Sequence, residues 1–241
     1  MLENLRQSIH EATLQLVDNG LVDYFRGTIS GFDRTRGLLV IKPRGVDYGS
    51  LTPDSYLVVS ARTGQVVEGV GMPSTGMDLH LRLYRDLPDI RSVVATLSKY
   101  ATMWAQAGRA IPCLGVAHAD FFQGEIPITP HYGEEIKEDE YYGKVAEQIV
   151  EFFEKSDADP GLVPAILVDR LGPVSWGDSP MDAARNAVYI EILAELAYGT
   201  LALNPELRPL ADADIRRHFS LMRKRGIVPF FRLRGRQIER R

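Results

Sequence analysis

The hydrophobic pattern of the chain changes its period several times between the two ends. Apolar residues recur every three or four positions in six stretches, which predicts helices over residues 2–17, 77–84, 99–107, 134–154, 181–203 and 214–224. Short runs of β-branched and aliphatic residues, bounded by Gly, Pro or Asp, predict strands over residues 27–33, 37–43, 55–60, 64–69, 91–97, 111–116, 126–129, 165–169 and 172–177.

These elements predict an α/β fold: one domain with a central, mostly antiparallel β-sheet flanked by helices. The sequence has no internal repeat and no linker-like boundary, so we assign one domain to residues 1–226 and a basic C-terminal tail to residues 227–241. Basic residues are already dense from residue 216 onward. That stretch is either a solvated helix with a frayed end or a patch that binds phosphate groups.

Composition adds limits on partners and on compartment. The chain has 241 residues, 45% of them hydrophobic and 25% charged, as in ordinary globular proteins, and its net charge of -4 does not favour nucleic acid as a partner. No apolar run approaches the roughly 20 residues that a membrane helix needs, and the N-terminus lacks the apolar core of a signal peptide. A lone Cys113 permits no intrachain disulfide, so we expect a cytoplasmic protein without a membrane contact.

The segment "VVATLSKYATMWAQAG", residues 93–108, joins a predicted strand directly to a predicted helix. Many α/β enzymes place polar groups at such a strand end. Here the strand ends in Ala-Thr-Leu, which offers only the hydroxyl of Thr96. Cys113 is a second candidate for chemistry, either as a nucleophile or as a small buried hydrophobe, and its strand-like surroundings favour the latter.

Several motifs together resemble the class II aldolase and L-ribulose-5-phosphate 4-epimerase family, with the epimerase branch most similar. They are "GTISGFDRTRGLLVIKPRGVDY", "LTPDSYLVVSARTGQVVEG", "PST", "YATMWAQAG", "IPCLGVAHADFF" and "GPVSWG", in that order along residues 1–226. The resemblance implies a three-layer fold. It also implies a fourfold homotetramer whose active sites lie between neighbouring subunits.

Members of this family are typically zinc enzymes, in which the metal stabilises the enediolate formed beside a carbonyl. The family takes its zinc ligands from an H-T-H sequence and from a later H-G-P sequence. In this chain the corresponding residues are Ala95, Leu97 and Leu171, and none of their side chains can bind a metal. We therefore expect no metal and no other cofactor.

Further positions of the family's chemistry are also changed. The acidic residue after the phosphate-binding serines corresponds to Gly76, and the asparagine of the Gly-rich loop corresponds to Thr28. The C-terminal tyrosine region reads Phe230-Phe231. We expect Leu97, Leu171 and Phe231 to form an apolar floor that favours a larger and less polar substrate than a pentulose phosphate.

Other family positions are retained, and the resemblance implies their roles. Lys42 and the pair Ser74-Thr75 would hold an anionic group of the substrate, and Gly27 and Ser30 would keep part of the Gly-rich, anion-binding loop. Arg44, in place of a serine, either adds an anion contact or points to solvent.

The resemblance also implies proton-transfer residues. Asp120, in "HADFF", corresponds to the family's acid/base aspartate, and His218 to a histidine near its active site. His118 is two residues from Asp120, so on an extended segment both would face one side. His118 is then either a donor in the pocket or a satisfied core histidine. We expect His80 and His131 to be structural or exposed.

Two functions remain open. In the first, the protein is a zinc-independent lyase or isomerase that acts beside a carbonyl of a small, possibly anionic or phosphorylated molecule, and does not epimerise L-ribulose 5-phosphate. In the second, it is a pseudoenzyme that binds a ligand or an active paralogue without turnover. The joint retention of Lys42, Ser74 and Asp120 favours the first slightly, and the loss of three metal ligands favours the second.

Overall fold

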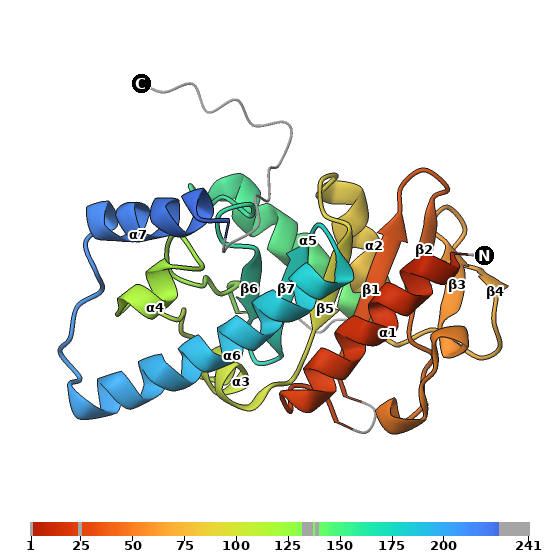
Figure 1. Cartoon of the computed structure of the whole chain (residues 1–241), viewed down its shortest axis with the longest axis horizontal. Helices are drawn as coiled ribbons and strands as arrows, with labels where there is room; N and C mark the ends of the chain where they lie inside the picture. The colour runs from red at the N-terminus through yellow and green to blue at the C-terminus, as the bar shows by residue number, and fades with distance from the viewer. Residues whose placement is uncertain (1, 24–25, 132–136, 138–139, 227–241) are drawn as a thin grey trace.

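The computed structural model describes residues 2–23, 26–131, 137 and 140–226. A seven-stranded sheet forms its centre, and Figure 1 shows how the helices surround it. The strands run in the order β4-β3-β2-β1-β5-β7-β6, and every pair of neighbours is antiparallel. They are β1 (Thr28–Asp33), β2 (Leu38–Ile41), β3 (Leu57–Ser60), β4 (Val66–Glu68), β5 (Ser92–Ala95), β6 (Ala165–Val168) and β7 (Gly172–Gly177).

Helices cover both faces of the sheet. They are α1 (Glu3–Asp18), α2 (Met77–Asp86), α3 (Lys99–Gln106), α4 (Val116–Ala119), α5 (Tyr141–Lys155), α6 (Pro180–Leu203) and α7 (Asp212–Lys224), with two short 3₁₀ turns at Tyr48–Ser50 and Pro53–Ser55. Helices α1 and α6 pack on one face and α2 and α5 on the other (Figure 1). The predicted three-layer α/β domain with an antiparallel sheet is therefore confirmed.

The alternation of side chains along the strands builds the two cores. Ile29 of β1 and Val94 of β5 point toward α1, whereas Val93 and Ala95 point toward α2 and α5. The apolar stripe of α1, with Ile9, Ala12 and Leu16 fully buried, completes one core.

Two sequence predictions in the middle of the chain are wrong. Residues 111–116 and 126–129 are not strands; they contribute only isolated bridges, Ile111 with Ile126 and Ile128 with Leu167. The segment between them contains the short helix α4 instead of an extended loop. Propensity alone misses this helix because it is only four residues long and is stabilised by packing against α7.

Candidate functional site

A pocket of about 250 Å³ opens where the ends of β1, β5 and β7 meet the N-terminal ends of α2 and α5. It brings together six of the predicted residues, from four separate segments of the chain: Gly27, Thr28, Ser74, Thr75, Leu97 and Leu171. Its lining also includes Arg26, Gly76, Leu79, Ala95, Thr96, Tyr142, Gly172, Pro173 and Val174.

The pocket includes the three positions at which the resemblance would place zinc. Ala95 ends β5, Leu97 follows it, and Leu171 precedes β7, so pairing of β5 with β7 holds them together. The lining contains no imidazole, thiolate or carboxylate, and the described residues contain no cluster of three or more His, Cys, Asp or Glu placed to hold a metal. This donor set does not fit zinc.

Ser74 and Thr75 stand at the entrance to α2, on the pocket wall. No side chain caps the N-terminus of this helix, whose first residue, Met77, follows Gly76. Unpaired amide groups and the helix dipole make such a terminus favourable for an anion. Arg26 lines the same pocket, but Asp23 engages its guanidinium through an Nε–Oδ1 hydrogen bond of 2.7 Å.

Gly27 is required by its left-handed backbone and by close contacts with Val22 and the end of β5. Its φ is +88°, and a Cβ atom there would lie 2.7 Å from Val22 Cγ1 and 3.3 Å from the carbonyl oxygen of Ala95. The hydroxyl of Tyr48 donates a 2.7 Å hydrogen bond to the Gly27 carbonyl. This contact fixes the start of β1, and with it Thr28, against the end of β5.

Lys42 lies beside the pocket and is not part of its lining. Its side chain is 3% exposed, and its Nζ sits 4.7 Å from the centre of the Tyr48 ring and donates to the Pro43 carbonyl at 3.3 Å. Burial lowers the pKa of Lys42, and the charge of Asp47 opposes that shift. Among the described residues, Lys42 Nζ has no carboxylate hydrogen-bond partner, and its contacts are with Tyr48 and Pro43 rather than with the pocket.

Arg44 and Ser30 both lie outside the pocket lining. Arg44 is exposed in the single chain. Ser30 is not part of a loop: it is buried inside β1, where its Oγ lies 2.7 Å from Nδ1 of His80 and 2.8 Å from the hydroxyl of Tyr84. This network ties β1 to α2 behind the pocket.

His80 and His131, which we predicted to be structural or exposed, differ in their burial. His80 is fully buried, and burial lowers its pKa to about 3, so its imidazole is neutral. His131 is exposed, and its Nδ1 lies 2.6 Å from Oδ2 of Asp169. Neither residue lines the pocket.

Asp120 and His218 form a pair, away from the pocket. Nδ1 of His218, on α7, lies 3.3 Å from Oδ1 of Asp120, at the end of α4. Figure 1 shows α4 and α7 near one end of the long axis, with β1 and β2 toward the other. Neither residue lines the pocket of its own chain.

The predicted extended geometry of His118 and Asp120 is wrong. His118 is inside α4, and Asp120 caps that helix, so the two side chains do not share a face as they would on a strand. His118 is 4% exposed and packs edge-on against Phe122. Burial lowers its pKa to about 4, and its Nε2 has no hydrogen-bond partner among the described residues, so it is a buried histidine whose hydrogen bonds are not all satisfied. Phe231 lies outside the described residues.

Sequence reasoning missed Tyr142 as a pocket residue. Tyr142 reaches the pocket from α5, more than forty positions after β5. Only the packing of α5 against α2 brings it there, and no local pattern signals that contact. In the sequence, Thr96 is the one hydroxyl-bearing residue at the end of the predicted strand, and in the structure it lines the pocket.

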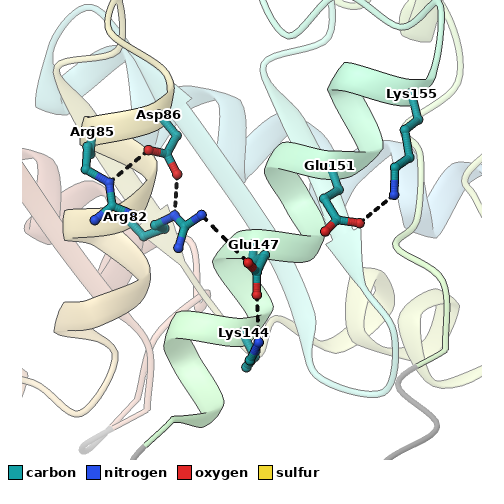
Figure 2. A network of polar contacts seen from close by, with 7 residues as sticks. All are labelled: Arg82, Arg85, Asp86, Lys144, Glu147, Glu151 and Lys155. Carbon is teal, nitrogen blue, oxygen red and sulfur yellow. Dashed lines mark hydrogen bonds and ion pairs between the residues drawn. The ribbon is translucent and has the colours of Figure 1, made fainter.

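A larger groove of about 820 Å³ lies between α2 and the turns that join β1 to β2 and β3 to β4, and five arginines line it. Four of these arginines already form hydrogen bonds or ion pairs with other groups of the protein. Arg34 donates to the carbonyls of Tyr84, Leu87 and Ile90, and Arg36 pairs with Asp33 at 2.9 Å. Figure 2 shows Arg82 and Arg85 both bound to Asp86. The smaller pocket is therefore the better candidate site.

Comparison with known proteins identifies the family. The sequence profile of the class II aldolase and adducin N-terminal domain matches residues 7–198. The chain therefore belongs to this family.

Solved structures share the fold. An L-fuculose 1-phosphate aldolase is 21% identical, with a TM-score of 0.75, over 91% of this chain and 96% of that one. YgbL from Escherichia coli is 24% identical, with a TM-score of 0.70, over 90% and 98% of the two chains. An L-fuculose-1-phosphate aldolase from Thermus thermophilus is 19% identical, with a TM-score of 0.64, over 86% and 98%. None of the described helices has the length and apolar character to cross a bilayer.

Proposed function

We propose that the protein is a zinc-independent lyase or isomerase that moves a proton beside a carbonyl of a small anionic molecule. The observation that carries this proposal is the pocket itself: Ser74 and Thr75 line its wall at the start of α2, and the apolar residues Ala95, Leu97 and Leu171 line it as well. An apolar floor beside a polar end suits a substrate with an anionic group and a less polar body.

The proton would be taken by Asp120 of a neighbouring subunit. Asp120 does not line the pocket of its own chain, so the proposal requires the homotetramer that the resemblance implies. The carboxylate removes a proton from the carbon beside the carbonyl, and the electron pair moves to the carbonyl oxygen. His218 holds Asp120 in position from a distance of 3.3 Å.

The enolate oxygen needs a partner in place of zinc. The hydroxyl of Thr28, a residue that lines the pocket, has no hydrogen-bond partner among the described residues and would serve as this partner. Preorganised donors in a site with little water stabilise developing charge more strongly than water does. L-Ribulose 5-phosphate is not the expected substrate.

A test uses dihydroxyacetone phosphate, a small phosphorylated hydroxyketone, in D₂O with EDTA present. Proton NMR should show deuterium exchange at the carbon beside the carbonyl. Asp120→Asn should slow the exchange by at least about 100-fold, as loss of a general base does. Asp212→Asn, an exposed change at the start of α7, is the control and should keep the wild-type rate.

Three results would count against the proposal. If EDTA abolishes exchange and zinc restores it, or if purified protein holds stoichiometric zinc, the zinc-independent part is wrong. If Asp120→Asn exchanges at the wild-type rate, another group moves the proton. If wild-type protein binds the probe but never exchanges it, the proposal fails.

The last result would favour the second candidate, a pseudoenzyme that binds a ligand or an active paralogue. The observation behind this alternative is that, among the described residues, the pocket lining with Gly76, Ala95, Leu97 and Leu171 holds no carboxylate and no imidazole. Co-purification with a metal-binding paralogue would support it.

A further inference from the structure

We infer that the groove between α2 and the turns of the first two hairpins is a second binding site, for a small ligand that carries two or more linked phosphate groups. We call it the arginine groove. No residue lines both this groove and the smaller pocket, so the inference does not rest on the proposed function. The arginines in its lining are Arg34, Arg36, Arg62, Arg82 and Arg85.

The arginines reach the groove from two walls. Arg34 and Arg36 belong to the turn between β1 and β2, and Arg62 belongs to the turn between β3 and β4. Arg82 and Arg85 come from α2. A guanidinium group presents paired N–H donors that match the oxygens of a phosphate group. Guanidinium groups that converge on one space therefore suit a ligand that concentrates several phosphate charges there.

The ion pairs on α2 leave positive charge and free donors. Figure 2 shows that Arg82 and Arg85 share the carboxylate of Asp86, and each of them contacts it through Nε. One carboxylate cannot neutralise two guanidinium groups. Arg82 also lies 3.9 Å from Glu147, but that carboxylate already accepts a 2.9 Å hydrogen bond from Lys144.

The arginines on the turns are also incompletely neutralised. Arg34 donates to three backbone carbonyls, which carry partial and not full charges. Arg62 is exposed and has no hydrogen-bond or ion-pair partner in the described part of the chain. Arg36 is paired with Asp33. Asp78 is the one carboxylate in the described lining. Against the five arginines stand three carboxylates, those of Asp33, Asp78 and Asp86, so two positive charges are left over.

The groove has the size of a ligand site and one of its arginines is held in place. Its volume of about 820 Å³ is within the range of small-molecule sites and leaves room for more than one phosphate group. The Arg34 guanidinium lies 5.2 Å from the centre of the Phe32 ring, and Phe32 stacks on Tyr84 with 4.9 Å between the ring centres. A side chain that is already ordered loses less entropy when a ligand binds.

The first test measures binding of inorganic tripolyphosphate by calorimetry, with EDTA present. The wild type should bind it, and Arg62→Ala should weaken binding by at least about fivefold, because a charge-assisted hydrogen bond is lost. Arg208→Ala is the matched control, since Arg208 is also an exposed arginine without a described partner, between α6 and α7. It should bind like the wild type. Neither change breaks a described contact, so both variants should keep the wild-type Tm.

A second variant is expected to act in the opposite direction. Asp78→Asn removes the carboxylate of the lining and should strengthen tripolyphosphate binding by roughly two- to fivefold, the size of an exposed charge interaction. Asp212→Asn is its control, because Asp212 is likewise an exposed acidic residue in the first turn of a helix. The control should leave the affinity unchanged.

Further probes identify the source of the phosphates. ATP should also bind, and Arg62→Ala should weaken its binding as well. Tighter binding of ATP than of tripolyphosphate would assign the groove to nucleotides, whereas equal affinity would assign it to a phosphate chain without a base. Both results require the site. Tighter binding of a hexaglutamate peptide than of tripolyphosphate would overturn the phosphate assignment.

The remaining outcomes separate the arginine groove from the smaller pocket. Saturating dihydroxyacetone phosphate, the probe of that pocket, should not displace tripolyphosphate. Displacement would show that both compounds bind one site and would overturn the inference. So would the absence of tripolyphosphate binding to the wild type, or equal affinities of wild type, Arg62→Ala and Asp78→Asn. None of these results depends on whether the pocket moves a proton.

Discussion

His80 and His118 couple the stability of the fold to pH. Burial disfavours the imidazolium and lowers the pKa of His80 to about 3 and of His118 to about 4. In the unfolded chain both titrate near 6.5. Between these values the unfolded state binds more protons than the folded state, so stability falls as the pH falls below about 6.5.

We predict that unfolding in urea at pH 5 shows a loss of roughly 2 kcal/mol per buried histidine relative to pH 7.5. His80→Asn and His118→Asn should each reduce this pH-dependent loss, whatever they do to stability at pH 7.5. His131→Gln, at an exposed histidine, should not reduce it. A free energy of unfolding that is constant from pH 7.5 to 5 would show that both imidazoles can be protonated in the folded protein.

At the scale of elements, α3 depends on a contact from another helix. Ser98 precedes α3, but its side chain makes no capping hydrogen bond. Instead, the carboxylate of Glu191, on α6, accepts hydrogen bonds from the backbone amides of Tyr100 at 2.8 Å and Ala101 at 3.0 Å. A negative charge at this end of a helix is also favoured by the helix dipole. This contact fixes the helix that follows Leu97, and so supports the pocket floor.

We predict that Glu191→Ala lowers the free energy of unfolding by roughly 2 kcal/mol, because two amide groups lose a charged acceptor. Glu191→Gln should lose less, since its one carbonyl oxygen still accepts. Glu154→Ala, on an exposed part of α5, should stay within about 0.5 kcal/mol of wild type. Equal losses for Glu191→Ala and Glu154→Ala in urea denaturation would show that solvent caps α3.

At the scale of the whole molecule, α6 leaves apolar side chains on the surface of the single chain. Its inner face, with Ala183, Ala187 and Ile190 buried, packs on the sheet. Its outer face exposes 46% of Ile192 and 51% of Leu196, which lie one helical turn apart. Exposed apolar residues that lie together on a helix are typical of a subunit interface.

We predict that the purified protein sediments as a homotetramer, as the family resemblance implies, and that Leu196→Asp shifts it toward smaller species. A charge introduced at an apolar interface must be desolvated without a partner, which weakens association. Val70→Asp, at a residue 95% exposed next to β4, is the control and should leave the mass unchanged. A monomeric wild type in analytical ultracentrifugation would also remove the route by which Asp120 reaches the pocket.

The candidate site was partly predictable. Ala95, Leu97, Ser74 and Thr75 were found by their motifs, and the structure brings them to one pocket. The motifs also located Lys42, Asp120 and Ser30, but they did not predict the contacts of these residues. Lys42 lies over the Tyr48 ring, Asp120 pairs with His218, and the Ser30 hydroxyl lies within hydrogen-bond distance of His80. Each of those contacts joins segments from different parts of the chain, which no local pattern encodes.

The sequence by itself determined most of the sheet and the main helices. An alternating apolar pattern allows a strand to bury one face, and a helical apolar pattern allows a helix to bury one face, so each pattern indicates one kind of element. It also determined that Ala95, Leu97 and Leu171 offer no metal-binding atom in their side chains, since the identity of a side chain limits its chemistry. Only the tertiary structure decided that Thr28, Gly76 and Tyr142 meet, and that Asp120 lies away from its own chain's pocket. Those relations depend on how helices pack across the sheet, and that packing is set by the whole core rather than by any one segment.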